Sequence, residues 1–155
     1  MQPAGQLDEQ PQRRVHRQPL AVVTGAGRGF GEALAGELSA AGWLVVAVVR
    51  QAAQSAALDL LPGVQAVVHD VRSEDVSTVI DAVRGRPVDL LINNAAQGAP
   101  HQPLGGVDAA GVLNAVDVNA AGPLRLVQAL LPQLLESDER RSSRFVSLGA
   151  PDLDW

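Results

Sequence analysis

One glycine-rich stretch carries the clearest chemistry in this sequence. It follows a short apolar run and reads Thr24-Gly25-Ala26-Gly27-Arg28-Gly29-Phe30-Gly31. Glycines let a backbone turn tightly and approach a ligand closely, because no side chain stands in the way. If a helix begins after the turn, its first N–H groups and its dipole favour an anion such as a pyrophosphate. An ordinary glycine-rich turn is the structural alternative, and the elements on either side decide between the two.

Three other polar positions follow apolar runs or lie within a helical pattern. Asp70 and Val71 follow the run 64–68, Asn93-Asn94-Ala95-Ala96 follows the run 90–92, and Asn119 lies in Val118-Asn119-Ala120. Taken singly, each has an ordinary structural explanation, as a turn former or as a helix residue bonded to a neighbour. Their meaning depends on the elements that position them.

The apolar runs at 20–23, 44–49, 64–68, 90–92 and 145–146 show no alternation of polar residues, apart from Gln65. Such runs are typical of strands buried on both faces of a parallel sheet. Helical patterns separate them. We expect one helix at 30–41 with Gly42 as its C-cap. A second is expected at 73–84, with a start like a capping box at Ser73, and a long helix at 109–135 interrupted at Gly122-Pro123.

This order of elements predicts an α/β fold, a Rossmann-like doubly wound parallel sheet of about five strands with helices on both faces. A chain of 155 residues suggests a single domain. Residues 1–18 are rich in Gln, Pro and Arg, and we expect them to form a disordered N-terminal tail. Residues 19–155 would then form the nucleotide-binding domain.

The turn, written T-G-x-x-x-G-x-G, resembles the cofactor motif of the short-chain dehydrogenase/reductase family of classical type. Asp70-Val71, Asn93-Asn94-Ala95-Ala96 and Asn119 match further motifs of that family in the right order, and the resemblance covers about residues 19–150. It implies hydride transfer between a nicotinamide cofactor and a carbonyl or alcohol substrate. It also implies the cofactor-binding residues, which are Thr24, Gly25, Arg28, Gly29, Phe30, Gly31, Arg50, Asp70, Val71, Asn93 and Ala95.

The end of the second expected strand bears on the choice of cofactor. NAD-preferring sites place a carboxylate there to accept hydrogen bonds from the ribose 2′-OH. This sequence instead reads Val48-Val49-Arg50, and Arg28 stands in the glycine turn. Guanidinium groups suit a phosphate, and in the resembled family basic residues at these two places imply NADP(H). The alternative is that both arginines are merely solvated.

The residues expected to catalyse the reaction are largely missing. The resembled family uses a Tyr, a Lys, a Ser and an Asn, but this chain contains no Tyr, and its 12 basic residues are all Arg. Asn119 matches the asparagine. Ser147 lies just before Gly149 and Ala150, where the family's serines align best. The chain ends at Trp155, before the Tyr-bearing helix would begin, and we therefore expect a C-terminally truncated, incomplete domain.

Three functions remain open at this point. The first is an NADP(H)-dependent short-chain oxidoreductase whose Tyr and Lys lie outside this chain. The second is a non-catalytic NADP-binding pseudoenzyme or partner subunit. The third is a protein that keeps the fold without redox chemistry.

Composition argues against several other classes of protein. A net charge of −5 disfavours nucleic-acid binding, and no apolar run is long enough to cross a membrane. The polar N-terminus lacks a signal-peptide pattern, so we expect a cytoplasmic protein. There is no cysteine, and His16, His69 and His101 lack the spacing of metal ligands. The apolar stripe of the long expected helix is either core or the contact surface of a homo-oligomer; it comprises Leu113, Val116, Leu124, Val127, Leu130 and Leu134.

Overall fold

The computed structural model describes residues 17–98 and 103–138. Within these ranges, four strands form one sheet in the order β3-β2-β1-β4. They are β1 (Leu20–Thr24), β2 (Leu44–Val49), β3 (Val64–Val68) and β4 (Leu90–Ile92), and every neighbouring pair is parallel. The parallel sheet confirms the predicted fold class. The expected strand at 145–146 lies outside the described residues.

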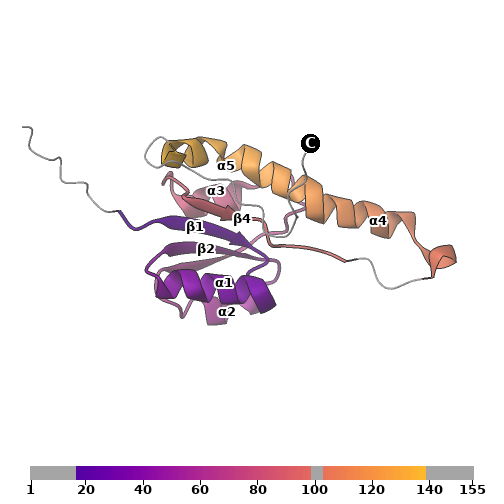
Figure 1. The fold of residues 1–155 in the computed structure, drawn as a ribbon, viewed down its shortest axis with the longest axis horizontal. Helices are drawn as coiled ribbons and strands as arrows, with labels where there is room; N and C mark the ends of the chain where they lie inside the picture. The colour runs from indigo at the N-terminus through magenta and orange to yellow at the C-terminus, as the bar shows by residue number, and fades with distance from the viewer. Residues whose placement is uncertain (1–16, 99–102, 139–155) are drawn as a thin grey trace, which may run out of the picture.

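Helices cover both faces of this sheet, as predicted (Figure 1). On one face lie α1 (Gly29–Ala40) and α2 (Ser55–Leu58), and on the other lie α3 (Ser77–Val83) and α5 (Gly122–Asp138). A short 3-10 turn, Ala52–Gln54, leads into α2, and another, Leu104–Gly106, precedes α4 (Ala109–Val116). The order of strands and helices therefore brings the carboxyl ends of β1, β2 and β4 to one edge of the sheet.

Polar and apolar residues do not alternate along β1 and β2, because both faces of these strands are buried. Val22, Val46 and Val48 pack with α3 and α5, whereas Val23, Val45, Ala47 and Val49 pack with α1 and α2. Each strand contributes to both clusters, because successive side chains point to opposite faces of a sheet. A polar residue on either face of these strands would have been buried.

Helix α3 begins at Ser77, so the predicted start at Ser73 is wrong. The hydroxyl oxygen of Ser73 accepts a hydrogen bond from the Asp75 N–H at 3.2 Å, and the Asp75 carboxylate accepts one from the Ser77 N–H at 2.9 Å. The Ser73 N–H donates to the Asp70 carbonyl oxygen at 2.8 Å. These local bonds hold a turn where the helix was expected, since Ser and Asp side chains compete for backbone groups.

The long helical run is interrupted just before the expected position, because Gly122 and Pro123 are the first two residues of α5. Asp108 caps α4 by accepting from the N–H groups of Ala110 and Gly111, and a π turn (Asp117–Ala121) joins α4 to α5. Pro123 has no N–H to continue the regular ladder. Gly122 packs against Val71, and a Cβ on this glycine would lie 2.9 Å from the Val71 carbonyl oxygen. The wide turn and the glycine together press this helix against the loop after β3.

A buried carboxylate anchors the opposite end of the sheet. Both carboxylate oxygens of Asp89 accept hydrogen bonds from Arg17 at 2.8 Å, and the side chain of Asp89 is 3% exposed. The Leu20 N–H and the Ser137 hydroxyl also donate to it, at 2.8 and 2.7 Å. Ordered contacts thus reach back to Arg17, two residues before the expected domain start at 19. Residues 1–16 of the expected tail lie outside the described residues.

Candidate functional site

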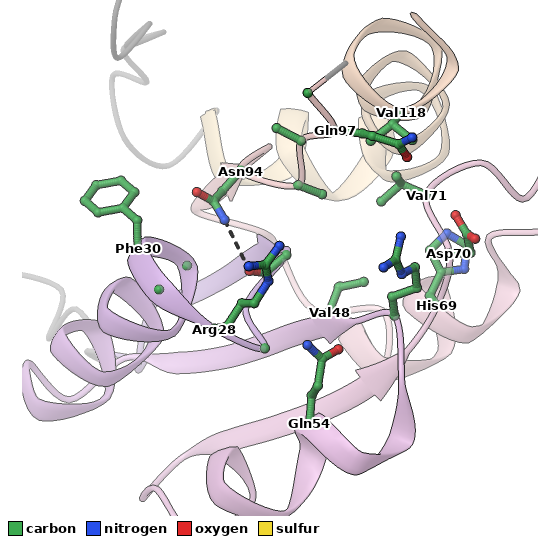
Figure 2. Close-up of a pocket in the computed structure, with 18 residues that line it drawn as sticks. Arg28, Phe30, Val48, Gln54, His69, Asp70, Val71, Asn94, Gln97 and Val118 are labelled. Atoms are coloured by element: carbon green, nitrogen blue, oxygen red, sulfur yellow. Dashed lines mark hydrogen bonds between the residues drawn. The ribbon is translucent and has the colours of Figure 1, made fainter. Parts of the chain in front are cut away.

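A cavity of about 710 Å³ opens at the carboxyl ends of the strands (Figure 2). This volume is within the range of roughly 300 to 1,000 Å³ that is typical of small-molecule and cofactor sites. The cavity lies where the chain crosses from β1 toward β2 on one side and β4 on the other, which is the usual ligand position in open α/β sheets. Its walls come from the turn after β1, the end of β2, the loops after β3 and β4, and the π turn.

Most of the expected cofactor-binding residues line this cavity. They are Gly25, Arg28, Gly29, Phe30, Gly31, Arg50, Asp70, Val71 and Ala95. Thr24 and Asn93 are not among the lining residues. The cavity is also lined by residues that were not among the expected cofactor-binding residues, among them Gln54, His69, Asn94, Gln97 and Val118.

The glycine turn has the backbone that its sequence suggested. Gly25 and Gly29 have φ angles of +65° and +59°, a conformation that favours glycine. A Cβ on Gly31 would lie 2.5 Å from Nδ2 of Asn94, whereas one on Gly29 would meet nothing within 4 Å. Arg28 is the N-cap of α1 and makes no side-chain cap hydrogen bond. Gly29, the first residue of α1, thus has unfilled space beside it, and an anion can approach the first N–H groups of the helix there.

Hydrogen bonds of the Thr24 and Asn94 side chains join this turn to the loop after β4. The Thr24 hydroxyl oxygen accepts from the N–H groups of Asn94 and Ala95, each at 3.0 Å. Nδ2 of Asn94 donates to the carbonyl oxygen of Thr24 at 3.0 Å. It also donates to the carbonyl oxygen of Gly25 at 3.3 Å (Figure 2). Asn93 is exposed instead. The structure therefore gives Thr24 a positioning contact and places Asn94, the neighbour of the expected Asn93, at the turn.

Charged side chains surround the end of the cavity near β2 and β3. Asp70 accepts a hydrogen bond from Nε of Arg72 at 3.0 Å, and this bond is the main reason that the pKa of Asp70 falls to about 2. Nη1 of Arg72 also donates to Asn114 on α4 at 3.0 Å. Asp70 is therefore ionised and oriented at neutral pH. Within residues 17–98 and 103–138, neither Arg28 nor Arg50 forms an ion pair.

Asn119 lies in the π turn and bonds the loop after β4. Its Oδ1 accepts from the Gln97 N–H at 2.8 Å, and its Nδ2 donates to the Gln97 carbonyl oxygen at 2.9 Å. Both polar groups of the side chain therefore hold backbone, and they fix the lining residue Gln97. The predicted Ser147 lies outside the described residues. Asn119 is thus the one expected catalytic residue that the structure locates.

His69 is a buried residue of this site that the sequence did not single out. Its side chain lines the cavity next to Asp70, although the residue is only 7% exposed. Nδ1 lies 3.5 Å from the Thr78 hydroxyl, and Nε2 is buried with no hydrogen-bond partner in the described part of the chain. Burial lowers the pKa of His69, although the nearby Asp70 and Asp75 carboxylates act to raise it. The imidazole is therefore neutral at physiological pH.

No group of His, Asp or Glu side chains in the described ranges is arranged to hold a metal ion. No helix in the same ranges has the length and apolar character needed to span a membrane.

Comparison with known proteins places this site in a family. The family model for the short chain dehydrogenase matches residues 19–149. Sulfoacetaldehyde reductase 2 of Chromohalobacter salexigens is 33% identical over 143 residues, covering 88% of this chain and 56% of that protein. An uncharacterized short-chain type dehydrogenase/reductase of Sinorhizobium fredii is 33% identical over 122 residues, covering 79% of this chain and 48% of that protein. The chain thus spans about half the length of the curated relatives it matches.

Solved structures give the same result. A 3-ketoacyl-(acyl-carrier-protein) reductase from Brucella melitensis, complexed with NADH, superposes with a TM-score of 0.73 at 32% identity, covering 79% of this chain and 52% of that one. A metagenomic short-chain oxidoreductase in complex with NADP gives a TM-score of 0.67 at 29% identity, covering 77% of this chain and 58% of that one. The glycine turn, the parallel sheet and these matches together show that the chain belongs to the short-chain dehydrogenase family.

Proposed function

We propose that this chain binds NADP(H) as the cofactor module of a short-chain oxidoreductase acting on a carbonyl or alcohol substrate. One observation carries the choice of cofactor. Arg50 directly follows β2 and lines the cavity at the place where NAD-preferring sites carry a carboxylate. Arg28 lines the same cavity from the glycine turn. Two guanidinium groups without an ion pair in the described ranges suit a 2′-phosphate.

The residues that line the cavity fit such a dinucleotide. The N-terminus of α1, open at Gly29, would hold the pyrophosphate. The ionised carboxylate of Asp70 can accept hydrogen bonds from the exocyclic amine of an adenine, because Arg72 keeps it charged and oriented. Asn119 would fix the loop after β4 through Gln97. When bound, the nicotinamide supplies or accepts the hydride.

Proton transfer is the part of the reaction that these residues do not explain. Reduction of a carbonyl requires a proton donor beside the oxygen that gains charge. The chain contains no Tyr and no Lys, and Asn119 uses both polar groups on Gln97. These facts favour, as a second candidate, an NADP-binding protein that is not itself catalytic. Oxidation of NADPH by this chain in the presence of an aldehyde or ketone panel would contradict that second function.

The proposal is tested by calorimetric titration of the full chain with NADPH and with NADH, for the parent protein and for Arg50→Ala. A hydrogen bond to a charged group contributes about 1.5 to 3 kcal/mol, or roughly a 10- to 150-fold change in affinity. We expect NADPH to bind more tightly than NADH by about that factor, and Arg50→Ala to remove most of the preference. Arg86→Ala, which removes a positive charge away from the cavity, serves as the control. Equal affinities for the two nucleotides in the parent chain would contradict the proposal.

We also propose that the chain associates with a second copy through α4 and α5. Several apolar side chains on these helices are exposed, among them Leu113 at 69% and Leu124 at 56%. Exposed apolar surface of this kind marks contact sites in soluble proteins. Light scattering of the parent chain and of Leu113→Glu tests the idea, because a dimer that uses this surface should dissociate in the variant.

A further inference from the structure

The side chain of Gln54 lies at the cavity wall between the glycine turn and the end of β2. It belongs to the 3-10 turn Ala52–Gln54 and lines the cavity together with Arg28 and Arg50. Figure 2 shows its amide directed into the cavity, with the nitrogen on the side of Arg28. Neither the motif of the glycine turn nor the roles assigned above account for this residue.

Local hydrogen bonds fix the orientation of this amide. Oε1 of Gln54 accepts from the Gln51 N–H at 3.2 Å, and the Gln54 N–H donates to the Gln51 carbonyl oxygen at 3.0 Å. The two glutamines cap the 3-10 turn reciprocally. The amide oxygen is therefore occupied, while the two N–H groups of Nε2 have no hydrogen-bond acceptor within the described ranges.

Contact with the glycine turn places the Gln54 amide against Gly27, the residue that precedes Arg28. A Cβ on Gly27 would lie 2.6 Å from Cδ of Gln54 and 2.7 Å from its Nε2. A side chain at position 27 would therefore overlap the Gln54 amide unless Gln54 moved. The contact holds the segment after β2 directly against the turn, and the Gln54 side chain lines the same cavity as Arg28 and Arg50.

We propose that Gln54 is a specificity-determining residue whose Nε2 donates a hydrogen bond to the 2′-phosphate of NADP(H). The inference rests on the proposed function. In dinucleotide sites the segment after the second strand faces the adenosine ribose, whereas the pyrophosphate sits at the helix N-terminus. A donor on this segment therefore faces the 2′ substituent. Gln54 therefore interacts more weakly with the ribose hydroxyl of NAD(H) than with a phosphate, because its amide is neutral and the amide oxygen is already hydrogen-bonded.

Three substitutions separate hydrogen bonding from packing and from charge. Gln54→Met keeps a side chain of similar length against Gly27 but has no donor. Gln54→Glu replaces the donor with a carboxylate, which repels a phosphate and accepts hydrogen bonds from a ribose hydroxyl. Gln128→Glu makes the same charge change at an exposed position of α5 and serves as the matched control. Circular dichroism establishes that each variant is folded before titration.

Calorimetry with NADPH, NADH, 2′,5′-ADP and 5′-AMP gives the readout. We expect Gln54→Met to weaken binding of NADPH and 2′,5′-ADP by about tenfold or more, and that of NADH and 5′-AMP by less than about twofold. Gln54→Glu should weaken NADPH further and strengthen NADH. Gln128→Glu should change none of the four affinities appreciably.

Two outcomes would overturn the inference, and they are distinguishable from failure of the proposed function. If the parent chain prefers NADPH but Gln54→Met binds all four ligands as the parent does, Gln54 makes no contact with the phosphate. If Gln54→Met weakens all four ligands equally, the side chain only shapes the wall. If the folded parent chain binds none of them, the proposed function itself fails, and this inference fails with it.

Discussion

Replacing Asp89 with alanine should lower the free energy of unfolding by about 3 to 5 kcal/mol. The Asp89 side chain is 3% exposed and accepts hydrogen bonds from Arg17, the Leu20 N–H and the Ser137 hydroxyl. Burial acts to raise the pKa of Asp89, but the hydrogen bonds from Ser137, Leu20 and Arg17 outweigh it and the pKa is lowered. The carboxylate is thus charged in the folded chain and tied to three separate segments.

The size of the effect follows from what the substitution leaves behind. Each buried donor without an acceptor costs about 1 to 3 kcal/mol, and the Leu20 N–H and the Ser137 hydroxyl would both lose theirs. Arg17 is 27% exposed, so water can solvate part of its charge and the loss of that ion pair adds less. Ser137→Ala removes one hydrogen bond and leaves the carboxylate paired. It should therefore cost only about 1 kcal/mol.

Urea unfolding of the full chain, followed by far-UV circular dichroism, measures these differences as shifts of the midpoint at constant slope. Asp81→Ala provides the control, because Asp81 is exposed on α3 and its loss should change the free energy by less than about 0.5 kcal/mol. A loss below about 1 kcal/mol for Asp89→Ala would refute the reasoning. It would mean that the three donors find other partners, and that the anchor adds little to holding β1, β4 and α5 together.

Three further predictions concern the cavity. Gly31→Ala should abolish NADPH binding measured by calorimetry, because the added Cβ lies 2.5 Å from Nδ2 of Asn94. Gly36→Ala is the control, because it lies in the same helix and its Cβ would meet nothing within 4 Å. This variant should bind NADPH as the parent does, and its folded state should be more stable by up to about 1 kcal/mol. Burial lowers the pKa of His69, so below about pH 6.5 the unfolded chain binds a proton that the folded chain does not. The urea midpoint of the parent chain should therefore fall as the pH decreases from about 7 to 5. It should fall less steeply in His69→Phe. The ionised Asp70, with a pKa of about 2, stabilises the fold above about pH 4 and loses this effect between about pH 4 and 2; Asp70→Asn should flatten that part of an acid titration followed by circular dichroism.

The strands were predictable because their burial leaves a mark in the sequence itself. Val45 and Ala47 face one helical layer and Val46 and Val48 the other, so no polar residue interrupts the run. The glycine turn was predictable for a similar reason, since its positive φ angles and close approaches restrict residue type directly. The start of α3 was not, because Ser73 is as good a residue for a turn as for a helix cap.

Other parts of the site depend on partners that are distant in the chain. Asn93 and Asn94 are chemically identical, and only the hydrogen bonds of Asn94 to Thr24 and Gly25, about seventy residues away, distinguish them. Gln54 belongs to the cavity because it packs on Gly27. His69 belongs to it because β3 ends beside β2. Residue type gives no signal for any of these three, since ordinary polar residues become site residues only through tertiary contacts.

The interruption of the long helix combines both kinds of information. Gly122-Pro123 predicts a break, because Pro123 cannot donate a backbone hydrogen bond. The sequence does not say what the break is for. In the structure, Gly122 lets the helix approach Val71, and the adjoining π turn presents Asn119 to the backbone of Gln97. The loops after β3 and β4, which form two walls of the cavity, are therefore held by the same turn of helix. A substitution at Gly122 should thus disturb Asp70 and Gln97 together, although neither residue is its neighbour in the chain.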